Sequence, residues 1–160
     1  MNLIIRPIEI KDKESWLPLW EGYLTFYETI LSPEQTALTW NRLLDPDFNM
    51  YGLVAECEDE ILGMTHFLFT LSTWVPINEC YLEDLYVKPG VRGGGIGRAL
   101  IDAVLERAKQ AGSGMVYWDT AEDNELARHL YDSYASESNM IQYRIPVTPS
   151  KTHSSDSLLR

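Results

Sequence analysis

Apolar residues recur with two different periods in the first half of the chain. LIIRPI at 3–8 is predicted to form a short strand, while residues 12–30 place apolar side chains three and four positions apart, as an amphipathic helix does. A Ser-Pro-Glu-Gln run beginning at Ser32 indicates the start of a second helix, which is predicted to end near residue 44. Three β-rich runs follow and predict strands at 51–57, 61–71 and 79–87.

The second half alternates between strand and helix patterns. After a glycine-rich segment the chain predicts a helix at 95–110, a strand at 115–119, a helix at 122–136 and a last strand at 140–145. This order implies an α/β fold, a mixed sheet with helices on both faces. We expect one domain over residues 1–146 and a polar, disordered tail over 147–160.

Composition narrows the classes of function. The net charge of −11 argues against a nucleic-acid partner and is compatible with a cationic substrate. No apolar run is long enough for a membrane span, and charges interrupt the first residues too early for a signal peptide. We therefore expect a cytoplasmic protein with reduced thiols at Cys57 and Cys80. No cluster has the spacing of metal ligands, so no metal is expected.

The segment VRGGGIGRAL at 91–100 lies between a predicted strand and a predicted helix. A P-loop would need Lys-Ser or Lys-Thr where Ile96-Gly97 stands, and a dinucleotide-binding loop would need glycine where Arg98 stands. Both nucleotide interpretations therefore fail. The arrangement Arg92-x-x-Gly95-x-Gly97 instead favours a pyrophosphate cradle, in which backbone N–H groups and the helix N-terminus face the anion.

Two stretches of the chain form recognisable motifs. The first is YLEDLYV at 81–87 followed by RGGGIGRAL at 92–100. The second is the pattern Asn-x-x-Ala-x-x-Leu-Tyr from Asn124 to Tyr131. Together they resemble the GNAT N-acetyltransferases, in particular the branch of histone, polyamine and amino-acid acetyltransferases, and the first stretch is similar to the family's acetyl-CoA motif. The resemblance covers roughly residues 3–146 and implies a mixed, mostly antiparallel sheet.

The resemblance also implies how acetyl-CoA, the co-substrate, is bound. Backbone groups of the strand would pair with the pantetheine arm, one N–H would polarise the thioester carbonyl, and the loop would hold the pyrophosphate. Asn124 would bond the pantetheine amides from the helix that it shares with Arg128. The full set of expected acetyl-CoA contacts is Leu85, Tyr86, Val87, Arg92, Gly93, Gly94, Gly95, Ile96, Gly97, Arg98, Asn124 and Arg128.

Three residues are candidates for catalysis. Tyr131 is the candidate general acid for the departing thiolate, on a helical face shared with Asn124 and Arg128. Glu83-Asp84 resembles the Glu-Asp pairs that line the acceptor site of polyamine acetyltransferases, and this resemblance favours Glu83 as the base, followed by Asp84, with deprotonation directly or through water. Adjacent strand residues point to opposite faces unless a bulge intervenes, so the choice between the two carboxyls stays open.

Several other residues are expected to pack rather than react. His66 lies in an apolar strand, and the aromatic residues of the first helix recur at core spacing.

From the two motifs and the candidate catalytic residues, the chain is predicted to acetylate a primary amine of a small molecule by direct attack in a ternary complex, with homodimerisation implied by the family. The alternatives are a protein lysine or N-terminus as acceptor, or a silent acyl-CoA-binding module.

Overall fold

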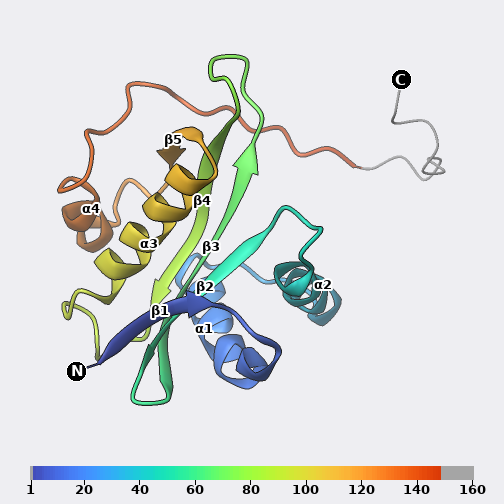
Figure 1. Ribbon diagram of the computed structural model, residues 1–160, viewed down its shortest axis with the longest axis vertical. Helices are drawn as coiled ribbons and strands as arrows, with labels where there is room; N and C mark the ends of the chain where they lie inside the picture. The colour runs from blue at the N-terminus through green and yellow to red at the C-terminus, as the bar shows by residue number, and fades with distance from the viewer. Residues whose placement is uncertain (1, 149–160) are drawn as a thin grey trace. The chain divides into compact units, whose positions relative to one another are not determined.

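The computed structural model of the protein describes residues 2–148 (Figure 1). Its elements, in chain order, are β1 (Leu3–Pro7), a 3-10 turn (Ile10–Asp12), α1 (Lys13–Phe26), α2 (Pro33–Leu44), β2 (Tyr51–Cys57), β3 (Glu60–Thr70), β4 (Asn78–Val87), α3 (Ile96–Gln110), β5 (Ser113–Tyr117) and α4 (Glu125–Tyr131). Contacts group the described residues into two compact units, one that ends at residue 124 and one that begins at residue 125. The predicted boundary after residue 146 remains a prediction, and most of the predicted tail, 149–160, lies outside the described residues.

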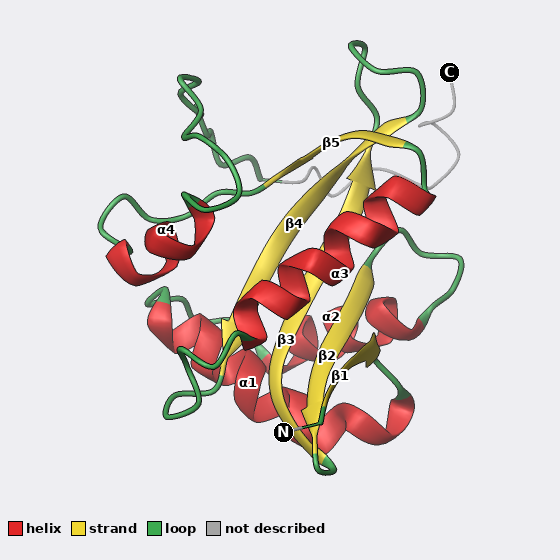
Figure 2. Cartoon of the chain, turned by 60° about the vertical axis from the view of Figure 1, so that its left-hand side comes forward, coloured by secondary structure: helices red, strands yellow, loops and turns green. Residues whose placement is uncertain are grey.

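The five strands form one sheet in the order β1-β2-β3-β4-β5. The first three pairs are antiparallel, and β4 with β5 is the parallel pair. Parallel neighbours need a crossover connection, and α3 provides it between β4 and β5 (Figure 2). The predicted fold class, α/β with a mixed, mostly antiparallel sheet, is confirmed.

Different helices cover the two faces of the sheet (Figure 2). On one face α3 buries Leu100, Ile101 and Val104 completely. On the other, α1 and α2 contribute Trp16, Leu19, Trp20, Trp40 and Leu43 to a core that includes Met64 of β3. Gly63, the neighbour of Met64, faces the opposite side, where an added Cβ would lie 3.2 Å from both Ile96 and Leu100. The strand alternation therefore separates the two layers.

Local signals explain where the first helices begin and end. Ser32 caps α2 as predicted, since its Oγ accepts the backbone N–H of Gln35 at 3.1 Å, with Pro33 in the first turn. α1 ends at Phe26, four residues earlier than the apolar pattern predicted. Glu28 has a φ of 51°, a left-handed conformation that ends a helix. Periodicity alone does not encode this stop.

The 125–160 unit is less regular than predicted. α4 covers Glu125–Tyr131 instead of 122–136, and its last turn continues as backbone turns to Tyr134. The strand predicted at 140–145 is absent from the structure. An alternating apolar pattern makes a strand only when another strand pairs with it, and α4 is the only helix or strand described in this unit.

Candidate active site

β4 has a partner on its β5 side along only part of its length. The pairing runs from Asn78 opposite Ser113 to Tyr81 opposite Tyr117, where the two tyrosine rings stack 5.1 Å apart. β5 ends at this point, whereas β4 continues to Val87 and stays paired with β3. Within residues 1–124 no strand pairs with the β5-side edge of residues 82–87. An extended ligand chain can add to such an edge as a further strand.

The glycine loop that follows β4 has the backbone of a cradle. Gly93 and Gly95 have φ values of 85° and 83°, in the left-handed region that favours glycine. A Cβ built on either residue meets nothing within 4 Å, so the backbone there borders open space. Gly95 is also the N-cap of α3, and Ile96 behind it is buried. The loop therefore exposes backbone at the positive end of a 15-residue helix.

The two arginines of the loop lie differently. Arg92 turns back to β4, where its Nε donates to the carbonyl oxygen of Val87 at 2.9 Å and its guanidinium lies 5.2 Å from the centre of the Tyr86 ring. Arg98 is exposed in the first turn of α3. Both add positive charge around the cradle.

A β-bulge sits at Glu83. In the β3–β4 register His66 lies opposite Asp84 and Phe67 lies opposite Leu82, so Glu83 is the extra residue of β4. A bulge breaks the strict alternation of faces, so Glu83 and Asp84 need not point to opposite faces of the sheet. The side chain of Glu83 is exposed, whereas Asp84 is buried.

Asp84 ends a chain of buried hydrogen bonds. Its Oδ2 lies 2.9 Å from Nδ1 of His66, and the indole N–H of Trp16 donates to the other ring nitrogen of His66 at 3.0 Å. Thr65 donates to the backbone carbonyl of Asp84 at 2.8 Å. Trp16, His66 and Asp84 come from α1, β3 and β4, so the sheet register and the α1 packing bring them together.

Asp84 also perturbs its neighbour Glu83. Although the side chain of Glu83 is exposed on one side, partial loss of hydration against the protein and then the negative charge of Asp84 raise the pKa of Glu83, while a positive charge on His66 would lower it. Burial also raises the pKa of Tyr23 on α1, with further contributions from Asp84, Tyr27 and Glu83. A carboxyl with a raised pKa is a better proton acceptor near neutral pH than an ordinary glutamate.

An aromatic ladder leads from this cluster along α1. Trp16 stacks on Trp20 at 5.7 Å, Trp20 on Tyr23 at 5.5 Å, and Tyr23 contacts Tyr27 at 4.9 Å between ring centroids. The rings pass from the buried Trp16 to the exposed Tyr27. Aromatic faces and carboxylates together suit a cationic amine.

The remaining predicted residues belong to the region of α4. Asn124 lies one residue before the helix rather than in it, and its Nδ2 donates to Thr120 Oγ1 at 3.1 Å. Arg128 forms an ion pair with Glu137 at 2.7 Å, within the 125–160 unit. Tyr131 is the last residue of α4. The roles assigned to these three residues remain predictions.

The sequence pattern does not reveal the polar partners of Asp84. His66 was predicted to lie in the core and is indeed buried, but it is hydrogen-bonded on both ring nitrogens. Trp16 and Tyr23, seven positions apart, were assigned to the packing face of α1. The available signal was a histidine in an apolar strand together with an indole N–H that needs an acceptor.

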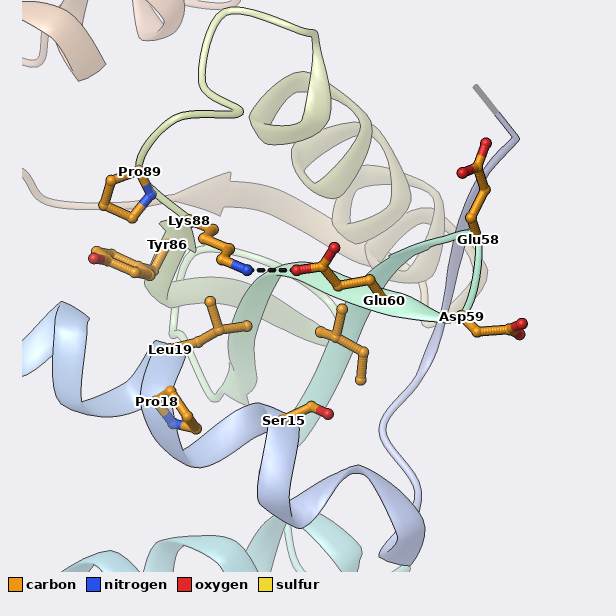
Figure 3. A pocket seen from close by; sticks show the side chains of 10 residues that line it. Ser15, Pro18, Leu19, Glu58, Asp59, Glu60, Tyr86, Lys88 and Pro89 are labelled. Atoms are coloured by element: carbon orange, nitrogen blue, oxygen red, sulfur yellow. Dashed lines mark hydrogen bonds and ion pairs between the residues drawn. The ribbon is translucent and has the colours of Figure 1, made fainter.

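A separate depression lies between the start of α1 and the β2–β3 turn (Figure 3). Tyr86, Lys88 and Pro89 line it from the end of β4, and Lys88 pairs with Glu60 across it. Glu83 and Asp84 are not among its lining residues. Within residues 2–148, no three His, Cys, Asp or Glu side chains are grouped to hold a metal ion, and no helix is long and apolar enough to cross a membrane.

The chain belongs to the acetyltransferase (GNAT) family, whose model matches residues 15–135. It is 36% identical over 146 residues to the D-amino-acid N-acetyltransferase HPA3 of Saccharomyces cerevisiae, covering 89% of this chain and 90% of the relative. It is 33% identical over 84 residues to the thialysine N-epsilon-acetyltransferase of Caenorhabditis elegans, about half of each chain.

The fold matches solved structures over nearly its whole length. The structure of AAC(6')-Iy in complex with the bisubstrate analog CoA-S-monomethyl-acetylneamine superposes with a TM-score of 0.78 at 17% identity, over 92% of this chain and 100% of that one. This likeness shows the fold. Together with the family match, the named relatives identify the protein as an acetyltransferase that acts on amines.

Proposed function

We propose that the protein transfers the acetyl group of acetyl-CoA to a primary amine of a small molecule, such as an amino acid, a polyamine or a similar amine. One observation carries the proposal. Glu83, the bulged residue of β4, lies next to Asp84 on the strand that leads into the glycine loop. The candidate proton acceptor and the candidate anion-binding loop therefore lie on one continuous segment of chain, with Arg92 nine residues after Glu83.

The donor side uses backbone groups. The unpaired edge of β4 at Leu85 and Val87 would take the pantetheine arm as an added strand, with Tyr86 between them. The loop from Arg92 to Arg98 would hold the pyrophosphate. The open space at Gly93 and Gly95 fits this assignment, because a side chain there would occupy the position of the phosphates.

The acceptor side uses side chains. The amine nitrogen attacks the thioester carbonyl carbon, and the C–N bond forms as the C–S bond breaks. The proton lost by the nitrogen passes to Glu83, directly or through water, and the departing thiolate takes a proton from Tyr131. Asp84 supplies a fixed negative charge that attracts a cationic acceptor and raises the pKa of Glu83. Asn124 and Arg128 are assigned to the pantetheine by the family resemblance alone.

A small acceptor is favoured over a protein. Tyr23 and Tyr27, at the more exposed end of the aromatic ladder, and the two carboxyls provide both contact area and charge for a compact cation. Both named relatives carry small-molecule acceptors in their names, a D-amino acid and thialysine. The cytoplasmic location and the homodimer remain predictions from the sequence.

Thiol release from acetyl-CoA tests the proposal. The purified protein is incubated with D-amino acids, thialysine, polyamines and a lysine-containing peptide, and the acetylated product is identified by mass spectrometry. We expect thiol release with at least one small amine and much less with the peptide. Tight acetyl-CoA binding without release for any amine would contradict the proposal and would favour a silent module.

A further inference from the structure

The hydrogen bonds around His66 restrict the protons that this histidine can carry. The indole nitrogen of Trp16 is a donor and never an acceptor. Because it lies 3.0 Å from Nε2 of His66, this ring nitrogen has to accept and cannot also carry a proton. The single proton of the imidazole is then on Nδ1, 2.9 Å from Oδ2 of Asp84, and it points at a carboxylate oxygen. The chain of donors therefore runs in one direction, from Trp16 through His66 to Asp84.

Burial makes this arrangement hard to change. The exposed fractions are 1% for Trp16, 2% for His66 and 8% for Asp84. Water is therefore largely excluded from His66, and a polar group buried without a partner would be unfavourable. Within the described residues, no buried side-chain nitrogen or oxygen lacks a hydrogen-bond partner. If Nε2 became protonated, two N–H groups would face each other in this closed space.

The ionisable groups around the Asp84 carboxylate come from three elements. His66 comes from β3, Tyr23 from α1, and Glu83 is the neighbour of Asp84 on β4. Tyr27, the residue that follows α1, contributes to the raised pKa of Tyr23. A positive charge on His66 would lower the pKa of Glu83, in opposition to Asp84. The charge state of His66 therefore determines whether the effect of Asp84 on the pKa of Glu83 is partly cancelled.

We propose that Trp16 and His66 are positioning residues: the indole holds His66 as the neutral Nδ1–H tautomer, and His66 holds Asp84 as an oriented carboxylate beside Glu83. This inference rests on the proposed function of Glu83 as the base. His66 does not take the substrate proton itself, because the nitrogen that would take it is occupied by Trp16. Its contribution is to remain uncharged, so that Glu83 keeps its capacity to accept a proton.

The tautomer can be measured without any substrate. In the full-length ¹⁵N-labelled protein, ring-nitrogen shifts report which nitrogen carries the proton. The chain has three histidines, so the signals lost in His66→Asn assign His66. We expect a protonated Nδ1 and an unprotonated Nε2. A protonated Nε2 in the wild type, either as the other tautomer or as the imidazolium, would overturn the proposal.

Three variants separate a positioning role of Trp16 and His66 from a packing role. In each variant the pH titration of Glu83 is followed through the ¹³C shift of its carboxyl group. Trp16→Phe removes the donor, allows His66 to become charged, and is expected to move the Glu83 titration about one pH unit lower. His66→Leu removes the donor to Asp84 and is expected to shift it in the same direction. His66→Asn places an amide N–H near the Nδ1 position and is expected to keep the wild-type titration.

The outcomes are distinguishable. If packing were the only role of His66, His66→Asn and His66→Leu would behave alike, and Trp16→Phe would leave the Glu83 titration in place. Backbone amide spectra show whether each variant is folded, and His66→Asn tests the proposal even if Trp16→Phe does not fold. A protein that releases no thiol with any amine would refute the proposed function but would not change the tautomer result. With an active protein, the acidic limb of the kcat/KM profile should move with the Glu83 titration.

Discussion

The glycine loop and the Glu83 cluster lie on the same strand and its continuation, but the chain builds them in opposite ways. The loop is contiguous, and it works through backbone conformation, with left-handed glycines at 93 and 95 leading into α3. The cluster gathers side chains from α1, β3 and β4, and it works through burial and charge. A substitution in the loop should therefore weaken binding of acetyl-CoA, and a substitution in the cluster should slow the chemical step.

This difference determines what could be predicted from the sequence. The loop was recognised because its residues are adjacent and because Ile96, Gly97 and Arg98 exclude the rival phosphate-binding motifs. Glu83 and Asp84 were identified as candidates, but the bulge depends on how β3 pairs with β4, and one extra residue in a register has no local pattern. The link from Asp84 to Trp16 spans 68 positions of chain and depends on the docking of α1.

The fold shows the same limit. The periodicity predicted all five strands of the sheet, because each run has an apolar face and a partner. The same reasoning failed at 140–145, where alternation is present but the structure has no strand. It also extended α1 beyond Phe26, because the apolar spacing continues through Tyr27 while the backbone at Glu28 turns left-handed.

The largest expected effect comes from Gly95→Val. A β-branched side chain at a φ of 83° strains the backbone and fills the open side of the cradle. Acetyl-CoA affinity, measured by calorimetry, should fall at least about 100-fold. Gly90→Val is the matched control, because Gly90 has a similar φ of 90° with nothing within 4 Å of an added Cβ, but it lies outside the segment assigned to the pyrophosphate. Normal acetyl-CoA binding by Gly95→Val would show that the loop does not hold the pyrophosphate.

Tyr131→Phe should affect the chemical step and leave binding of the donor intact. Loss of a general acid typically lowers turnover about 100-fold, and acetyl-CoA affinity should stay within about twofold of the wild type. Steady-state kinetics with the best amine provide kcat and KM. Tyr134→Phe, the same change three residues further on, is the control. Equal turnover in Tyr131→Phe and the wild type would exclude the acid role.

The pH dependence should sharpen the contrast within the cluster. Partial loss of hydration and the charge of Asp84 raise the pKa of Glu83 above the ordinary value of about 4.3. The base form of Glu83 is therefore lost as pH falls through that raised value, and kcat/KM should decrease about tenfold per pH unit below it. Acetyl-CoA affinity should stay flat over the same range. An acidic limb at the ordinary glutamate value, or the same limb in Glu83→Gln, would contradict this assignment.

The smallest effect concerns stability. A raised pKa means that ionised Glu83 is disfavoured in the folded protein, so its charge lowers stability above the raised pKa and has no effect once the group is protonated in both states. Glu83→Gln should therefore raise the Tm by about 1–3 °C at pH 8. The gain should disappear near pH 4. Glu21→Gln, an exposed carboxyl on α1, is the control, and an equal gain in that variant would point to net charge instead.

The central claim is that Glu83, displaced by the bulge, accepts the proton of the amine. A single-turnover experiment with saturating acetyl-CoA and the best amine tests it directly, because binding and product release do not limit the observed rate. We predict that Glu83→Gln binds acetyl-CoA as the wild type does and transfers the acetyl group at least about 100-fold more slowly at pH 7.5. Transfer at the wild-type rate in that variant would contradict the claim.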